Sequence, residues 1–168
     1  GFPRLGYSAP MPAGRGVIYL AIGARFLDEA RVSAASVRRH LPDLHITVFT
    51  DQHGPRGAEF DDVVAIEQSG RKPHRDKIRA CLLSPYPETL FLDTDTFVAA
   101  DLGGVFEVLG SHDLAASDDR GYQDRFPPGS GVPDCFTELN LGVVFFRRNA
   151  ATTDLFQAAL RRYDELGE

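Results

Sequence analysis

The sequence has few cysteines, no long apolar run and no excess of positive charge, and each of these shortages argues against a class of protein. Two cysteines, Cys81 and Cys135, are too few for a disulfide framework, which favours a reducing, cytoplasmic location. No apolar run approaches the roughly 20 residues of a membrane helix, and the opening Gly-Phe-Pro-Arg lacks the apolar stretch of a signal peptide. With 18 basic and 24 acidic residues the net charge is −6, so we expect no nucleic-acid partner.

What the sequence does contain is the composition of one folded domain. Apolar residues make up 43% and charged residues 25% of the 168 residues, which is an ordinary globular balance. The first residues are rich in proline and glycine, so we expect residues 1–16 to form an irregular arm. Residues 17–168 are expected to form a single domain, because about 150 residues is a typical domain size.

Short apolar runs alternate along the chain with segments of helical periodicity. This alternation indicates an α/β fold, a three-layer sandwich in which helices cover both faces of a mostly parallel central sheet. The first expected helix carries Asp28 and Glu29 in its first turn, where the helix dipole favours acids. The predicted strands are residues 17–22, 46–50, 63–66, 89–92, 114–117 and 141–146, and the predicted helices are residues 27–41, 76–83, 105–109 and 152–163.

The residues that follow the strands are the first candidates for a binding site, because parallel sheets bind ligands at the carboxyl ends of their strands. No Gly-x-Gly-x-x-Gly pattern follows the first strand, which argues against a dehydrogenase-type dinucleotide site. The strongest signal is Asp93 and Asp95, two carboxylates directly after the apolar strand at 89–92. Hard oxygen ligands at this spacing suit Mg²⁺ or Mn²⁺ shared with substrate phosphates. A polar turn that bonds to its own backbone is the alternative.

A basic segment precedes this strand and forms a local positive patch in an acidic protein. Helical spacing fans its side chains around the axis, so only one or two can face a site. We expect Lys77 and Arg75 to do so, and a solvated helix face is the alternative. The basic residues are Arg71, Lys72, Arg75, Lys77 and Arg79.

Further motifs accompany the Asp pair in a fixed order. They are Lys77-Ile78-Arg79, Ser84-Pro85-Tyr86, Asp101-Leu102, Val105-Phe106-Glu107, Leu114-Ala115-Ala116-Ser117-Asp118-Asp119, Pro133-Asp134-Cys135-Phe136 and Asn140-Leu141-Gly142-Val143. With Phe91-Leu92-Asp93-Thr94-Asp95-Thr96, this series resembles the glycogenin-like glycosyltransferases of the nucleotide-diphospho-sugar transferase superfamily. Members of that family have the GT-A fold and a DxD motif, and the resemblance spans nearly the whole chain. It implies metal-dependent, retaining transfer of a sugar from a nucleoside-diphosphate sugar, with UDP as the expected nucleotide.

The resemblance also implies roles for the residues around the Asp pair. Asp93 and Asp95 match the carboxylates that hold Mn²⁺ (or Mg²⁺) and, through it, the donor diphosphate. Thr94 matches the position where the backbone meets the ribose. Lys77 matches a lysine that approaches the donor, so these four residues are expected to bind it.

Residues from other strand ends complete the implied site. Ala21 and Ile22 match the position where main-chain groups meet the base, and Phe26 stands where the family often has Tyr. Asp119 matches an acid that reaches the transferred sugar, and Asn140 matches the Asn of an Asn-x-Gly segment near that sugar, so both are expected to be catalytic. Without the resemblance, Asp119 reads as a loop carboxylate and Asn140 as a turn residue that begins a strand.

The chain departs from the family pattern in ways that affect the expected activity. The family's third metal ligand, a His in a His-x-x-Gly-x-x-Lys segment, and its Asp-Gln acceptor motif are both missing. An acidic or Asn residue after the first strand is missing as well. These departures leave open a catalytic domain that is truncated at its C-terminus. The loop at 118–139 is longer than in glycogenin, so we expect a different acceptor.

Two other functions stay open at this stage. A phosphatase of the haloacid-dehalogenase class also ends a strand in Asp-x-Asp, with the first Asp as nucleophile and Mg²⁺ beside it. That class has Thr or Val where Phe97 stands, and it carries the motif near its N-terminus. The other alternative is a non-catalytic module that binds a nucleotide sugar.

Overall fold

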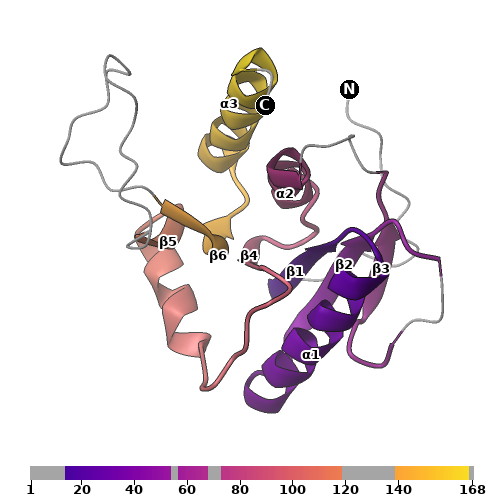
Figure 1. The fold of residues 1–168 in the computed structure, drawn as a ribbon. Helices are drawn as coiled ribbons and strands as arrows, with labels where there is room; N and C mark the ends of the chain where they lie inside the picture. Colours follow the sequence, from indigo (N-terminus) through magenta and orange to yellow (C-terminus); the bar gives the residue numbers. More distant parts are fainter. Residues whose placement is uncertain (1–13, 54–56, 68–72, 119–138, 167–168) are drawn as a thin grey trace.

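The computed structural model describes residues 14–53, 57–67, 73–118 and 139–166. Strands and helices alternate along the chain, as Figure 1 shows. In chain order the elements are β1 (Arg15–Ala21), α1 (Ala24–His40), β2 (His45–Thr50), β3 (Asp62–Ala65), α2 (Pro73–Leu82), β4 (Glu88–Leu92), the 3₁₀ helix η1 (Gly103–Gly110), β5 (Leu114–Asp118), β6 (Leu139–Arg147) and α3 (Ala150–Leu166).

The strands form one mixed, mostly parallel sheet in the order β3-β2-β1-β4-β6-β5. The pairs of β1 with β2, β1 with β4 and β2 with β3 are parallel, whereas β6 runs antiparallel to both β4 and β5. The carboxyl ends of β1 to β5 and the first residues of β6 therefore lie at the same edge of the sheet. We call it the carboxyl edge.

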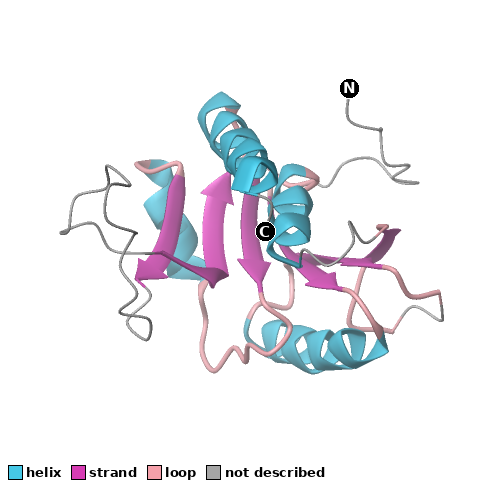
Figure 2. Cartoon of the chain, turned by 45° about the horizontal axis from the view of Figure 1, so that its top comes forward, coloured by secondary structure: helices cyan, strands magenta, loops and turns pink. Residues whose placement is uncertain are grey.

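Helices cover both faces of the sheet, which confirms the predicted three-layer α/β architecture (Figure 2). Because side chains alternate along a strand, the apolar run of β1 supplies two cores. Val17 and Tyr19 pack beneath α1 and η1, and Ile18 packs on the opposite face with Ala80 of α2 and Phe156 of α3. Among the described helices, none combines the length and the apolar character needed to cross a membrane.

The predicted elements are all present, with boundaries that differ by a few residues. The first helix begins at Ala24, so its first turn contains no acid, and the expectation that Asp28 and Glu29 lie there is wrong. The helix begins early because Gly23 turns the chain with a φ of 95°, and its N–H donates to Asp51 Oδ1 at 2.8 Å. Strand β1 begins at Arg15, and residues 1–13 of the expected arm lie outside the described residues.

Candidate functional site

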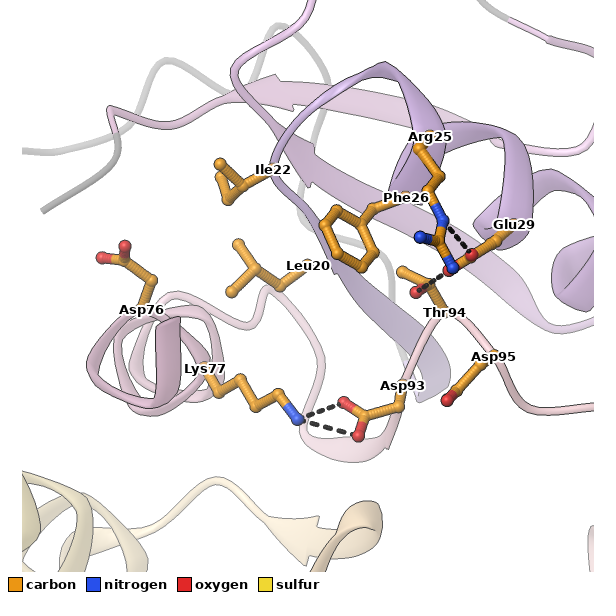
Figure 3. Close-up of a pocket in the computed structure, with 10 residues that line it drawn as sticks. All are labelled: Leu20, Ile22, Arg25, Phe26, Glu29, Asp76, Lys77, Asp93, Thr94 and Asp95. Atoms are coloured by element: carbon orange, nitrogen blue, oxygen red, sulfur yellow. Dashed lines mark hydrogen bonds and ion pairs between the residues drawn. The ribbon is translucent and has the colours of Figure 1, made fainter. Parts of the chain in front are cut away.

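A pocket of about 370 Å³ opens at the carboxyl edge between the ends of β1 and β4 (Figure 3). Helix α1 forms one of its walls and helix α2 another. Aliphatic and aromatic side chains line one part of it, and charged side chains line the rest. The lining residues are Leu20, Ile22, Arg25, Phe26, Glu29, Asp76, Lys77, Asp93, Thr94 and Asp95.

Lys77 and Asp93 form the charged centre of the pocket. Asp93 directly follows the buried strand β4, and Lys77 projects from α2 toward it (Figure 3). The Lys77 Nζ lies 2.7 Å from Oδ1 and 2.8 Å from Oδ2 of Asp93. An ammonium has three donors, so Lys77 can still donate to a further acceptor. Asp95 is exposed and carries a second negative charge into the same pocket.

Glu29 connects helix α1 to the residue between the two aspartates. The Thr94 hydroxyl donates to Glu29 Oε2 at 3.1 Å, and the Arg25 Nε donates to Glu29 Oε1 at 2.9 Å. Thr94 is buried, whereas the Glu29 side chain retains 29% exposure and lines the pocket. The Asp-x-Asp segment is therefore attached to α1 through a carboxylate that still faces the pocket.

Two more contacts with α1 fix the chain after the aspartates. The hydroxyls of Thr96 and Ser33 lie 3.0 Å apart, and the Val98 N–H donates to Ser36 Oγ at 2.9 Å. Ser33 is also 2.9 Å from the Tyr19 hydroxyl, whose pKa is raised by burial. Because most of this network is buried, its polar groups need these partners, and they tie the segment to α1.

Gly142 allows strand β6 to approach Asp93 closely. The Asp93 N–H donates to Gly142 O at 2.8 Å, and the Gly142 N–H donates to Asn140 Oδ1 at 2.7 Å. A Cβ at position 142 would lie 3.1 Å from Asp93 Oδ2 and 2.9 Å from Asn140 Oδ1. The Asn-x-Gly segment thus packs directly against Asp93. The sequence alone did not indicate this contact between distant segments.

Phe26 dominates the apolar part of the pocket, with Leu20 and Ile22 beside it (Figure 3). Its ring is 47% exposed, and the Arg25 guanidinium lies 5.9 Å from the ring centroid. Apolar side chains that remain accessible in a pocket are typical of ligand sites. Their position is set by the Gly23 turn at the start of α1.

Asp51 holds that turn. Partial burial raises the pKa of Asp51, but hydrogen bonds from the Gln52 side chain and the Gly23 N–H outweigh this effect and lower it below the usual range. The Gln52 Nε2 and the Gly23 N both lie 2.8 Å from Asp51 Oδ1. The ionised carboxylate at the end of β2 therefore stabilises the start of the helix that bears Phe26.

The structure brings together five of the predicted site residues, namely Ile22, Lys77, Asp93, Thr94 and Asp95. Ala21 is fully buried as a whole residue and is not a lining residue of the pocket. Asn140 lies beside Gly142 and is not a lining residue of the pocket. Asp119 lies outside the described residues, and so does Cys135. The predicted roles of all these residues remain predictions.

The expectation that Arg75 faces the pocket is wrong. Its guanidinium binds Asp164 of α3, with Nε–Oδ1 and Nη2–Oδ2 distances of 2.7 and 3.2 Å. Helical spacing identified the basic helix, but the packing of α3 decides which side of it is covered. Arg79 pairs with Asp76 at 2.6 Å, and Arg71 and Lys72 lie outside the described residues. Within the described part of the chain, Lys77 is the basic residue of α2 that lines the pocket.

The donor set fits a divalent cation that shares its coordination with a ligand. Two carboxylates, Asp93 and Asp95, provide hard oxygen atoms, and Mg²⁺ and Mn²⁺ are commonly held by one or two carboxylates with substrate phosphates. The described residues contain no cluster of three His, Cys, Asp or Glu side chains that could hold a metal ion. An ion held by these two carboxylates would complete its coordination with oxygen atoms of water or of a bound ligand.

The sequence interpretation gave Glu29 and Arg25 no role in the pocket. Both stand in the first two turns of the helix that follows β1, and Glu29 comes three residues after Phe26. In an α-helix, residues three apart share a face. This spacing, joined to the expected ligand contact at Phe26, is the signal by which Glu29 could have been found.

Comparisons with known proteins identify the fold. No protein-family model matches the sequence, and neither does any curated protein. The structure resembles the glycosyltransferase GlyE of Streptococcus pneumoniae, with a TM-score of 0.63 and 20% identity over 92% of this chain. It also resembles the galactosyltransferase LgtC in complex with donor and acceptor sugar analogues (TM-score 0.58, 17% identity, 84% of this chain) and the bifunctional glycosyltransferase WbbM (TM-score 0.54, 16% identity, 88% of this chain).

The chain spans only part of these proteins. It covers 39% of the GlyE chain, 59% of the LgtC chain and 34% of the WbbM chain. At this level of identity the comparisons show a shared fold. The predicted fold class is thereby confirmed.

Proposed function

We propose that the protein is a glycosyltransferase that moves a sugar from a nucleoside-diphosphate sugar, with UDP as the expected nucleotide, to an acceptor hydroxyl. The observation that carries this proposal is the pocket at the carboxyl edge. It combines an accessible aromatic ring, Phe26, with a cation and two carboxylates, Lys77, Asp93 and Asp95. A nucleoside diphosphate has the matching order of groups, a flat base, a ribose and a doubly charged diphosphate. The glycosyltransferase folds of GlyE, LgtC and WbbM support the same assignment.

The two parts of the pocket divide the donor between them. Phe26 offers a face for the base, with Leu20 and Ile22 beside it. Lys77 keeps donor capacity beyond its contact with Asp93, so it can bind a diphosphate oxygen. Asp93 and Asp95 would hold a divalent cation together with the diphosphate, and such a cation supplies compensation for negative charge on phosphate oxygens.

In the chemical step, negative charge develops on the leaving nucleoside diphosphate, at the charged end of the pocket. The bond between the anomeric carbon and the diphosphate oxygen breaks, and its electron pair leaves with the nucleoside diphosphate. The acceptor oxygen bonds to the anomeric carbon and transfers its proton to the departing diphosphate. Lys77 contacts the region where the extra negative charge develops, so it stabilises the leaving group more than the intact donor.

Two more residues belong to this proposal through the family resemblance. Asp119 would hold hydroxyls of the transferred sugar and so orient the anomeric carbon for attack. Asn140 would place a neutral amide near the positive charge that develops on the ring. Its position against Gly142, next to Asp93, supports that role. Retention of the anomeric configuration is the outcome expected from the family.

Donor binding and turnover in the full-length protein test the proposal. With Mn²⁺ present, we expect UDP-sugars to bind in isothermal titration calorimetry and to release UDP slowly by hydrolysis. A variant with Asp93→Asn and Asp95→Asn should lose both, whereas Asp154→Asn, on the exposed side of α3, should lose neither. A folded full-length protein that binds no common nucleotide sugar would contradict the proposal.

The same assay separates the two alternatives that the sequence left open. Binding of a nucleotide sugar without hydrolysis or transfer, in the full-length protein, would indicate a binding module. A phosphatase would instead form an aspartyl phosphate on Asp93, or bind beryllofluoride there as a mimic of that phosphate. Incubation with a labelled phosphate ester, followed by measurement of the label on Asp93, distinguishes these outcomes.

A further inference from the structure

Glu29 is a pocket carboxylate that has no role in the proposed transfer reaction. It lines the pocket from α1 beside Arg25, and its carboxylate meets the Thr94 hydroxyl (Figure 3). Its 29% exposure contrasts with the 70% of its neighbour Asp28, which points away and pairs with Arg31. An acid that is partly withdrawn from water and faces a pocket costs solvation free energy.

The hydrogen bonds of Glu29 fix its orientation without using all of its acceptors. One oxygen accepts from Arg25 Nε at 2.9 Å, and the other accepts from the Thr94 hydroxyl at 3.1 Å. A carboxylate has about four lone-pair sites, so about two are left. The carboxylate is therefore fixed in orientation and can still accept hydrogen bonds from a ligand.

The position of Glu29 matches one part of the proposed donor. With a base on Phe26 and a diphosphate at Lys77, the ribose would lie along the pocket wall at Thr94, whose hydroxyl donates to Glu29. The vicinal hydroxyls of a ribose are two donors on adjacent carbons, and carboxylates in other nucleotide-binding folds accept from them. The other charged groups at this point are the Arg25 cation, already bound to Glu29, and Asp95.

We propose that Glu29 accepts a hydrogen bond from the ribose hydroxyls of the bound nucleotide and makes the pocket selective for ribonucleotides over 2′-deoxyribonucleotides. This inference rests on the proposed function, since it assumes a nucleoside diphosphate in the pocket. Arg25 and Thr94 act as positioning residues, because each holds one oxygen of the carboxylate. Loss of the 2′-hydroxyl removes a hydrogen bond to a charged acceptor, which corresponds to an affinity ratio of about 10 or more.

Calorimetry with two pairs of nucleotides tests the inference. The probes are UDP with 2′-deoxy-UDP, and GDP with 2′-deoxy-GDP, each added to the full-length protein with Mn²⁺. The native protein should bind the ribonucleotide of one pair about tenfold more tightly than its deoxy form. Glu29→Ala should reduce that ratio to about one, mainly by lowering the affinity for the ribonucleotide. Glu29→Gln, which can still accept from Thr94, should give an intermediate ratio and serves if the alanine variant does not fold.

Asp28→Asn is the matched control, because Asp28 is the adjacent acid of the same helix and faces solvent. It should keep the native ratio. Equal binding of the two nucleotides by the native protein, or an unchanged ratio in both Glu29 variants, would overturn the inference about Glu29 alone. If the native protein binds neither member of either pair, the proposed function fails as well.

Discussion

Lys77 contacts both carboxylate oxygens of Asp93, at 2.7 and 2.8 Å, and so joins helix α2 to the end of the central strand β4. The pair compensates one of the two negative charges of the Asp-x-Asp segment. A divalent cation at Asp93 must therefore compete with the ammonium of Lys77. In the proposed donor complex, a diphosphate would change this balance, because it would supply both oxygen ligands for the cation and an acceptor for Lys77.

The first prediction follows from this competition. Lys77→Met should lower the affinity for UDP about tenfold, because it removes a charged donor to the phosphates. The same change should raise the affinity for Mn²⁺ in the absence of nucleotide, because Asp93 and Asp95 then lack a compensating cation. Calorimetric titrations with UDP and with Mn²⁺ alone measure both effects.

Arg75→Met is the control for this prediction, since Arg75 lies on the same helix and binds Asp164 of α3. It removes an equal charge and should change neither affinity. The two opposite effects of Lys77→Met distinguish a charge-compensating lysine from one that only packs. A fall in both affinities would contradict the proposed competition.

The second prediction concerns Asp95, which is exposed and has no hydrogen bond among the described residues. Asp95→Ala should change the free energy of unfolding by less than about 0.5 kcal/mol, as for other exposed side chains. The metal-dependent rate should fall at least about 100-fold, since one of the two carboxylates for the cation is lost. Urea unfolding and UDP release at several Mn²⁺ concentrations test the two parts, with Asp154→Ala as the exposed control. A variant with native Mn²⁺ dependence would refute the proposed metal site.

The parts of the fold that could be predicted from the sequence are those encoded by local patterns. The apolar run of β1 and the Asp pair after β4 both identify strand ends, and parallel strands place such ends at one edge. Prediction from the sequence fails where a contact between distant segments determines the position of a side chain. The Thr94–Glu29 hydrogen bond joins positions 65 residues apart, and no periodicity of either segment indicates it.

Arg75 is a second example of a side chain whose position depends on a distant contact. Its spacing in α2 is compatible with the pocket, but Asp164, 89 residues later, binds it on the opposite face of the helix. The early start of α1 has a similar cause, since Asp51, directly after β2, holds the Gly23 turn. Local propensity therefore identified each element, and contacts between elements determined which side chains reach the pocket.

The third prediction is a pH dependence caused by Asp51. Its pKa is lowered in the folded protein, so the folded state binds fewer protons than the unfolded state as the pH falls. The stabilisation is present above the unfolded value of about 4 and is lost as the pH falls through the folded value. The native protein should therefore be more stable than Asp51→Asn at pH 6, and the difference should shrink toward pH 3. Urea unfolding at each pH gives the two curves, and a constant difference would contradict the prediction.

The last prediction concerns Gly142, where a side chain would meet the candidate site. A Cβ there would lie 2.9 Å from Asn140 Oδ1 and 3.1 Å from Asp93 Oδ2. Gly142→Ala should displace the Asn140 amide, weaken its hydrogen bond to the residue 142 N–H at a cost of about 1 kcal/mol, and shift the Asp93 carboxylate. Because small displacements of a positioned group lower rates strongly, we expect a rate loss of about tenfold or more.

Gly104→Ala is the matched control, because nothing lies within 4 Å of a Cβ at that position of η1. Its rate of UDP release and its affinity for UDP should stay native. In Gly142→Ala, the loss of rate should exceed the loss of stability measured by urea unfolding, and the affinity for Mn²⁺ with UDP should fall as well. A Gly142→Ala protein that loses stability but keeps its Mn²⁺ affinity and its rate would show that the close approach of β6 to Asp93 serves packing alone.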